Sequence, residues 1–171
     1  QSPTILGTHT NCTGNEYVHV SGNYAFLACN RQDSELRVVD ITDKNNPIFV
    51  ARGFSAGATP TSVHVQGEVA YLTVLTGYLV MFNISNISGI PTPPLESYYP
   101  TIADFISSSN PYDGYTKDGL TYLASADLLE IVDVGNNIPE RDTPVGSVQT
   151  PGFSRAIVVN GNYAYLADDW K

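Results

Sequence analysis

Residues 18–28 read VHVSGNYAFLA, and the architecture of this 171-residue chain can be worked out from that stretch. A short apolar-biased run is followed by Gly22 and Asn23, and then by a second run in which apolar residues recur at every other position. Glycine beside asparagine supplies the positive φ angle that a tight turn requires. We therefore expect the two runs to pair as an antiparallel hairpin.

The same hairpin recurs along the chain. It returns as VHVQGEVAYLT at residues 63–73 and as IVVNGNYAYLA at residues 157–167, with a weaker copy, YTKDGLTYLA, at residues 115–124 that reads as one residue shorter at its turn. The aromatic residue before the shared leucine lies at Phe26, Tyr71, Tyr122 and Tyr165. These markers are 45, 51 and 43 residues apart, a period typical of repeat architectures.

Further strands are expected after each hairpin. Third strands are predicted at residues 36–41, 79–84 and 129–134, where nearly continuous apolar character indicates burial on both faces. Each has a polar residue near its end that can form an Asx turn: Asp40, Asn83 and Asp133. More exposed fourth strands are predicted at residues 48–52, 95–99 and 145–149.

Four antiparallel strands in a repeat of this length are typical of a propeller blade. The sequence therefore predicts an all-β fold, a β-propeller of four-stranded antiparallel blades, with about three and a half blades in residues 1–171. Those residues form a single propeller domain or a propeller fragment. The blade-like repeats span about 17–55, 62–99, 112–149 and 155–171, after an N-terminal strand at residues 4–9.

The repeats resemble the LVIVD-repeat family of β-propellers. The match lies in Gly22 to Ala28, Leu36 to Asp40 and Asn46-Pro47, and the hairpin motif returns at Gly161 to Ala167. The resemblance covers nearly the whole chain, and the third repeat departs most, with a Ser-rich insertion at residues 104–111. It implies a propeller on an exported or surface-anchored microbial protein, and it implies no reaction.

Composition excludes some partners. The formal charge is −9 with only eight Lys and Arg, so we expect no nucleic-acid binding, which needs a basic patch. No uninterrupted apolar stretch approaches 18 residues, so we expect no membrane insertion. Charged residues make up 15%, a low share that suits an extracellular or cell-surface location.

The last repeat contains only its first two strands, and the strand expected at residues 4–9 has no hairpin partner. Three explanations are open: a piece of a longer propeller, completion by a second copy or another chain, or a four-blade ring closed by the N-terminal strand. Unpaired strands at both ends favour assembly, and head-to-tail pairing that does not close would give a fibre.

Cys12 and Cys29 are the two cysteines, and a disulfide between them is expected to fasten the N-terminal lead to the first blade. Counting from the turn, Cys29 should lie opposite Glu16, so the lead must curl back at Gly14. The alternative is a pair of buried thiols.

No catalytic residues are assigned, and the protein is predicted not to be an enzyme. Residues 53–57 spell G-x-S-x-G but lack the strand–turn–helix setting of a hydrolase nucleophile, so we read them as a loop. His19 and His64 share one repeat position, at which the other copies place Thr116 and Val158. A position that accepts valine favours packed strand surface over metal binding.

The remaining candidate sites are weaker. Asp168 and Asp169 are the best local pair for calcium, the one cofactor considered, although calcium needs more oxygen ligands than these supply. Three sequons start at Asn11, Asn83 and Asn86, and Asn83 is expected to be partly occluded at its strand end. Candidate interaction residues are Tyr98, Tyr99 and Trp170.

The leading functional prediction is a non-enzymatic extracellular scaffold for structure or interaction, able to assemble through its unpaired edge strands. Its expected partner is itself or the remainder of a longer propeller, with a glycan or protein ligand as a further class. Two alternatives stay open: a ligand-binding or hydrolytic propeller with a loop-built site, and a calcium-stabilised adhesion module.

Overall fold

The computed structural model describes residues 2–10, 12, 14–30, 35–53, 59–75, 78–89, 110–135 and 144–169. Within these ranges the chain folds into four antiparallel sheets and one short 3-10 turn, η1 (Ile87–Gly89), and contains no α-helix. The predicted all-β class is therefore confirmed. In the described part of the chain, no helix is long and apolar enough to cross a membrane.

The sheets follow one another along the chain, and we call them blades 1 to 4. Blade 1 contains β1 (Asn15–Ser21), β2 (Tyr24–Cys29), β3 (Leu36–Asp40) and β4 (Ile48–Gly53). Blade 2 contains β5 (Pro60–Gln66), β6 (Val69–Val74) and β7 (Tyr78–Asn83). Blade 3 contains β8 (Pro111–Lys117), β9 (Leu120–Ser125), β10 (Leu128–Asp133) and β11 (Gly146–Gln149). Blade 4 contains β12 (Phe153–Asn160) and β13 (Tyr163–Asp169).

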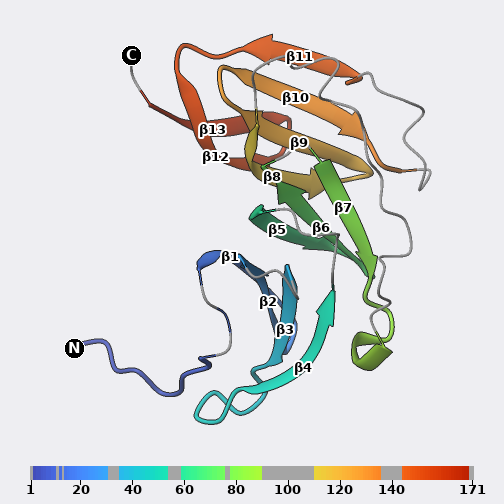
Figure 1. Cartoon of the computed structure of the whole chain (residues 1–171). Helices are drawn as coiled ribbons and strands as arrows, with labels where there is room; N and C mark the ends of the chain where they lie inside the picture. Colours follow the sequence, from blue (N-terminus) through green and yellow to red (C-terminus); the bar gives the residue numbers. More distant parts are fainter. Residues whose placement is uncertain are drawn as a thin grey trace.

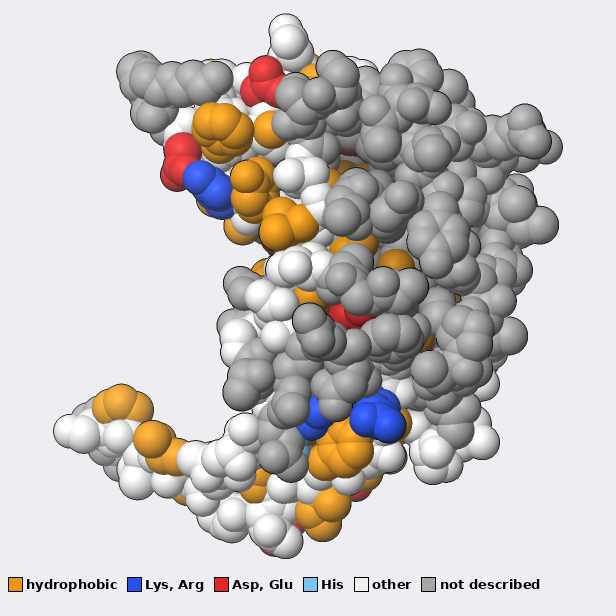
Figure 2. Space-filling model, in the orientation of Figure 1, with side chains coloured by type: hydrophobic (Ala, Val, Ile, Leu, Met, Phe, Trp, Pro, Cys, Tyr) orange, Lys and Arg blue, Asp and Glu red, His pale blue; other side chains and the backbone are white. Residues whose placement is uncertain are grey.

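The blades stand side by side in an arc, with blade 1 at one limb and blade 4 at the other (Figure 1). The first strands of consecutive blades are neighbours, β1 beside β5, β5 beside β8, and β8 beside β12. The space-filling view shows the same arc with a deep hollow between its two limbs (Figure 2). The first strand of each blade is therefore its inner strand, as in a propeller.

The four hairpins share one geometry. Their turns contain two residues, between the paired ends Ser21 and Tyr24, Gln66 and Val69, Lys117 and Leu120, and Asn160 and Tyr163. The third hairpin is thus not shorter, and our alignment of Thr116 with the histidines was wrong. Its turn places Asp118 (φ 53°) before Gly119 (φ 78°), whereas the others place glycine first, so matching the glycines shifted the register by one residue.

Each inner strand is interrupted near its start. In blade 1 the pairing shifts between Asn15 and Tyr17, and the equivalent shift recurs in β5, β8 and β12. Such a shift is a β-bulge, in which one strand carries an extra residue. Cys29 therefore pairs with Asn15. The plain count from the turn, which placed Cys29 opposite Glu16, was wrong.

The predicted Asx turns are confirmed. Asp40 Oδ1 accepts a hydrogen bond from the Thr42 amide at 2.8 Å. The same bond, at 2.9 Å, joins Asn83 to Ser85 and Asp133 to Gly135. These bonds end the third strands because the side-chain oxygen accepts the hydrogen bond of the backbone amide two residues further along the chain.

The predicted strand at residues 4–9 was wrong, since residues 2–10 have no regular secondary structure. The segment runs along the turn before β4, where a Cβ on Gly7 would lie 2.5 Å from the Lys44 carbonyl oxygen. A strand needs a partner for its backbone groups, and this segment pairs with neither blade 4 nor blade 1. The single chain is thus an open arc rather than a closed four-blade ring. The fourth strand predicted at residues 95–99 lies outside the described residues.

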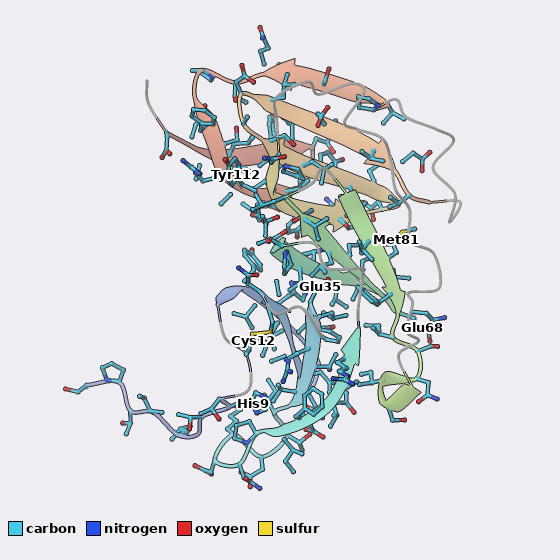
Figure 3. The ribbon with its side chains drawn as sticks, in the orientation of Figure 1. His9, Cys12, Glu35, Glu68, Met81 and Tyr112 are labelled. Carbon is cyan, nitrogen blue, oxygen red and sulfur yellow. A yellow bond between two sulfur atoms is a disulfide. The ribbon has the colours of Figure 1, made fainter. Side chains whose placement is uncertain are left out.

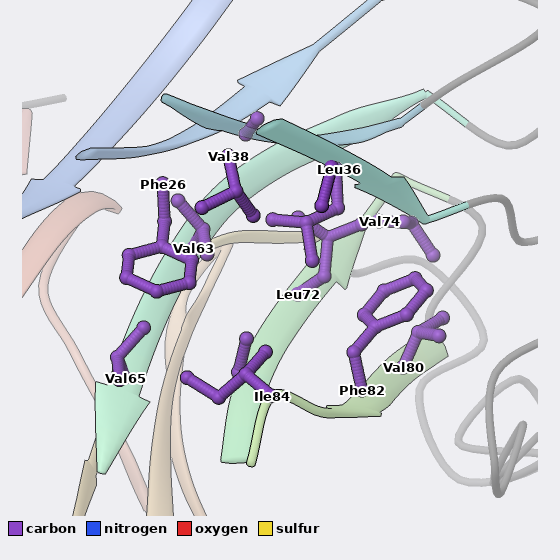
Figure 4. Close-up of a cluster of buried hydrophobic side chains, with 13 residues drawn as sticks. Phe26, Leu36, Val38, Val63, Val65, Leu72, Val74, Val80, Phe82 and Ile84 are labelled. Carbon is purple, nitrogen blue, oxygen red and sulfur yellow. The ribbon is translucent and has the colours of Figure 1, made fainter. Parts of the chain in front are cut away.

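The core lies between blades. The largest cluster joins Phe26, Leu36 and Val38 of blade 1 to the apolar face of blade 2 (Figure 4). The blade 2 side chains are Val63, Val65, Leu72, Val74, Val80, Phe82 and Ile84. Two smaller clusters fill the next two boundaries. Each boundary buries the facing sides of two blades, so every blade needs a neighbour on both sides.

Candidate functional site

Each blade has two faces. Side chains alternate along a strand, so positions equivalent to Val18 and Val20 look toward the preceding blade, and positions equivalent to His19 and Phe26 look toward the following one. We call these the back face and the forward face.

The back face of blade 1 is uncovered. Val18 is 51% exposed and Val20 is 57% exposed, whereas Val63, the equivalent of Val18 in blade 2, is fully buried. Ile157, the equivalent residue in blade 4, is 5% exposed. Blade 1 therefore presents to solvent a surface of the kind that blades 2 and 4 bury.

The forward face of blade 4 is uncovered in the same way. Tyr165 is 55% exposed, whereas Phe26 at the same repeat position is 1% exposed. Tyr163 beside it is 70% exposed, and Val158 on the neighbouring strand is 49% exposed. Figure 2 shows hydrophobic side chains gathered on the limb that contains blade 4. These face residues were missed from the sequence, although the repeat alignment could have indicated them.

A groove of about 610 Å³ lies between blades 3 and 4. Tyr122, Leu129 and Ile131 line it from the forward face of blade 3, and Val159 and Ala164 line it from blade 4. At the boundary of blades 1 and 2, the equivalents of Leu129 and Ile131 are Leu36 and Val38, which are fully buried against a cluster that includes β7 residues. The groove therefore lies where a third strand of blade 4 would pack.

The two carboxylates proposed for calcium have separate protein partners. Asp168 accepts hydrogen bonds from the Gly152 amide at 3.0 Å and the Ser154 hydroxyl at 2.8 Å. Asp169 forms a 2.9 Å ion pair with Arg155, and consecutive strand residues point to opposite faces. Within the described ranges no group of three or more His, Cys, Asp or Glu could hold a metal ion. Calcium binding stays a prediction.

Buried polar side chains join the inner strands. Asp113 Oδ2 accepts the Ile157 amide at 2.9 Å, and Ser62 Oγ accepts the Gly114 amide at 3.0 Å. The two acceptors occupy the same repeat position, so in blades 2 and 3 a side chain at this position holds the inner strand of the next blade. Burial raises the pKa of Asp113, although its hydrogen bonds oppose that shift. The pKa of Tyr17 is raised by burial and by the charge of Asp113.

The histidines form an aromatic row. The ring centroids of His19 and His64 are 4.5 Å apart, and those of His64 and Tyr115 are 4.3 Å apart. His64 Nδ1 accepts the Thr116 amide at 3.2 Å. Burial and the neighbouring His19 lower the pKa of His64 to about 4. Neutral histidine rings packed between blades agree with the interpretation of the His19 and His64 position as packed strand surface.

The structure contains a disulfide between Cys12 and Cys29, with the Cα atoms 5.5 Å apart (Figure 3). Asn83 and Asn86 are both exposed, so the expected occlusion of Asn83 was wrong. Asn83 ends its strand at a turn, which carries the side chain out of the sheet.

Several other candidates lie outside the described residues. These are Asn11, Tyr98, Tyr99, Trp170 and residues 54–57 of the G-x-S-x-G stretch. Gly53, which opens that stretch, ends β4 against the ring of Phe82.

Solved structures similar to the chain are propellers of low sequence identity. The β-propeller domain of Cps50 (Swd1) from Myceliophteria thermophila aligns with a TM-score of 0.56 and 14% identity, over 90% of this chain and 47% of that one. BamB from Moraxella catarrhalis aligns with a TM-score of 0.56 and 15% identity, over 88% and 39%. The chain thus spans less than half of either protein. At these identities the likeness shows the fold alone.

A computationally designed protein, Ika4, is similar over nearly its whole length. It aligns with a TM-score of 0.66 and 9% identity, over 98% of this chain and 93% of that one. The related design Ika8 aligns over 90% of this chain and 42% of its own length. No curated protein matches the chain in sequence.

The sequence profile of the LVIVD repeat matches residues 16–52, 57–93 and 151–171. The first two matches correspond to blades 1 and 2, and the third covers blade 4. Blade 3, with its reversed hairpin turn and Ser-rich insertion before it, is not matched. The matches together cover more than half of the chain, so the protein belongs to the LVIVD-repeat family of β-propellers.

Proposed function

We propose that this protein is a non-enzymatic extracellular scaffold that binds neighbouring propeller blades through the back face of blade 1 and the forward face of blade 4. One observation carries the proposal. The repeat positions that are buried between blades inside the arc are exposed at its two ends, as Val18 against Val63 and Tyr165 against Phe26 show.

The exposed side chains favour a partner of the same shape as a blade. Burying a side chain the size of valine stabilises a complex by about 1.5 kcal/mol or more, and a tyrosine buries a larger area. The back face of blade 1 carries Val18 and Val20 where blade 2 packs Val63 and Val65, and the forward face of blade 4 carries Tyr165 where blade 1 packs Phe26. A partner that offers the complementary blade face would therefore find a preformed docking surface on either limb.

The location rests on separate support. Disulfides persist mainly in oxidising compartments, and the Cys12–Cys29 bond fits an exported protein. The low share of charged residues agrees with this location. A hydrolytic or calcium-dependent function lacks a comparable observation among the described residues.

Hydroxyl-radical footprinting tests the proposal without knowledge of the partner. Side-chain oxidation would be measured by mass spectrometry on the purified chain and on cells that display the protein. We expect Tyr163 and Tyr165 to be oxidised severalfold less on cells. Val148, which is 56% exposed on β11, lies outside both faces and should react equally in the two samples. Equal oxidation of the tyrosines would contradict the proposal.

A further inference from the structure

We infer that Asn86 carries an N-linked glycan, which covers the outer side of the boundary between blades 1 and 2 and keeps β4 from pairing with other chains. The inference rests on the extracellular location in the proposed function and is independent of the two uncovered faces. It joins three observations: an exposed sequon on a folded turn, a hydroxyl already bonded to the asparagine, and a neighbouring edge strand with exposed apolar residues.

Two sequons meet where the chain leaves the third strand of blade 2. Asn83-Ile84-Ser85 ends β7, and Asn86-Ile87-Ser88 leads into η1. In both, the asparagine and the serine are exposed. The residue between them belongs to the core, since Ile84 is 7% exposed and Ile87 packs against the same cluster. The isoleucines therefore anchor the turn while both asparagines face solvent.

Each serine hydroxyl is bonded to its asparagine. Ser88 Oγ donates to Asn86 Oδ1 at 2.8 Å, and Ser85 Oγ donates to Asn83 Oδ1 at 2.6 Å. N-glycosylation uses an asparagine followed two residues later by a Ser or Thr hydroxyl. The folded turn thus already brings together the two side chains that define each sequon.

Asn86 is the better acceptor of a sugar. Asn83 is the last residue of β7, where it pairs with Val69, and its Oδ1 also accepts the Ser85 amide at 2.9 Å. A transferase would have to reach that side chain at the end of a paired strand. Asn86 lies beyond the strand, in the turn that leads into η1, and a turn is the more accessible substrate.

The transfer is a substitution at a sugar carbon. Asn86 Nδ2 forms a bond to the anomeric carbon of a glycosyl donor, and the bond from that carbon to a phosphate or diphosphate oxygen breaks. The leaving group departs with the bonding electrons, and the transferase takes one proton from the Nδ2 amide group. Oδ1 does not react, so Asn86 keeps its bond to Ser88 when the sugar is in place.

The glycan would stand beside an edge strand. η1 lies against β4, the outermost strand of blade 1, which pairs with β3 alone in the described sheets. On β4, Ile48 is 55% exposed and Phe49 is 38% exposed. Figure 1 shows η1 on the outside of the arc, away from the hollow between its limbs. An edge strand with exposed apolar side chains pairs with other chains unless it is covered, and a bulky hydrophilic glycan covers it.

Mass spectrometry of the protein from cells that display it tests the site. Chymotryptic cleavage after Phe82 and Leu95 releases one peptide that contains both sequons. Electron-transfer fragmentation then assigns an added sugar mass to Asn83 or to Asn86. We expect most copies of the protein to carry the sugar on Asn86.

Variants of the sequon sharpen this test. Asn86→Gln and Ser88→Ala should each abolish the modification. Ser88→Thr keeps a hydroxyl at this position and should retain it. Asn23→Gln is the matched control, because Asn23 is an exposed turn asparagine outside any sequon.

Aggregation tests what the glycan covers. In static light scattering, Asn86→Gln should aggregate severalfold faster than the wild type, and Asn23→Gln should not. Adding Ile48→Lys to the Asn86→Gln chain should slow aggregation again, because lysine on an edge strand opposes pairing. No effect of Ile48→Lys would overturn the protection of β4.

The outcomes separate this inference from the proposed function. An unmodified Asn86 together with protected Tyr163 and Tyr165 on cells would overturn the glycan and leave the docking faces in place. A modified Asn86 with equally oxidised tyrosines would support the glycan and contradict the docking faces. Sugar on Asn83 alone would overturn the choice of Asn86.

Discussion

The amide of Ile157 in blade 4 donates a 2.9 Å hydrogen bond to the buried carboxylate of Asp113 in blade 3. The bond holds the first strand of a two-stranded blade against a four-stranded neighbour.

Replacing Asp113 should loosen blade 4. Asp113→Ala leaves the Ile157 amide without its acceptor, and such a loss lowers the free energy of unfolding by about 1–3 kcal/mol. Asp113→Ser introduces the side chain that performs this role in blade 2 and should recover part of the loss. Urea denaturation measures both. An unchanged midpoint for Asp113→Ala would show that the bond does not stabilise the fold.

Gly53 should tolerate no side chain. A Cβ there would lie 2.3 Å from a ring carbon of Phe82, and overpacking of this kind destabilises by about 1–3 kcal/mol. Gly146→Ala is the matched control, since its Cβ would meet the Ile131 side chain at 3.7 Å, an ordinary contact. Thermal melting compares the two. Adding Phe82→Leu should reduce the effect of Gly53→Ala, and additive effects would argue against the contact.

Glu130 should make the protein more stable in acid. Burial raises its pKa from 4.5 to about 7, and the nearby Ser125 hydroxyl partly offsets that rise. Between those values the folded chain holds a proton that the unfolded chain releases. The contribution of Glu130 to the free energy of unfolding therefore falls as pH rises from about 4.5 to 7, by at most about 1.4 kcal/mol per pH unit. His64 contributes in the opposite direction over much of this range, so Glu130→Gln should make the free energy of unfolding rise more with pH than it does in the wild type, in denaturation series at several pH values. An unaltered pH dependence would exclude Glu130 as a source.

His64 should make the protein less stable in acid, which is the opposite of the effect of Glu130. Its pKa is lowered by burial from 6.5 to about 4, so in that range the unfolded chain holds more protons. The contribution to stability is complete above pH 6.5 and is lost as pH falls toward 4. His64→Tyr introduces the residue that blade 3 has at this position, Tyr115. The free energy of unfolding of this variant should rise more steeply than that of the wild type as pH falls. A curve identical to that of the wild type would contradict the shift.

The disulfide should stabilise blade 1. Cys12 and Cys29 are 17 positions apart, and closing a loop of that size stabilises by about 3 kcal/mol in the chain-entropy account. The Cys12→Ser, Cys29→Ser double variant should melt at a lower temperature, and reductant should no longer change its melting. A wild type equally stable with and without reductant would contradict this.

The repeats were enough to predict the blades because period and turn chemistry are local properties. Strands were placed within a residue or two at β3, β4 and β11. The inner-strand bulges could not be predicted, since the extra residue leaves no mark in the apolar pattern. The third hairpin was misaligned because its turn holds Asp118 at a positive φ angle before Gly119, whereas the other turns place the glycine first.

The exposed faces were harder to foresee. Val18 and Val63 are identical residues in nearly identical stretches, and only the presence of a preceding blade distinguishes them. The strand expected at Thr4 to His9 was wrong for a related reason. Its sequence pattern is that of a strand, but a strand forms only beside a partner strand. Burial of Glu130, a carboxylate in an apolar-patterned strand, also depends on the neighbouring blade.

The hydrogen bonds described across the boundary of blades 2 and 3 have a mechanical consequence. Ser62, His64 and Thr61 each contribute a side chain to a backbone group of blade 3, whereas strands inside a blade are joined by continuous backbone ladders. A force that opens the arc would part this boundary while the sheets on either side stay intact. The blade, rather than the strand, is the unit in which this chain would yield under tension.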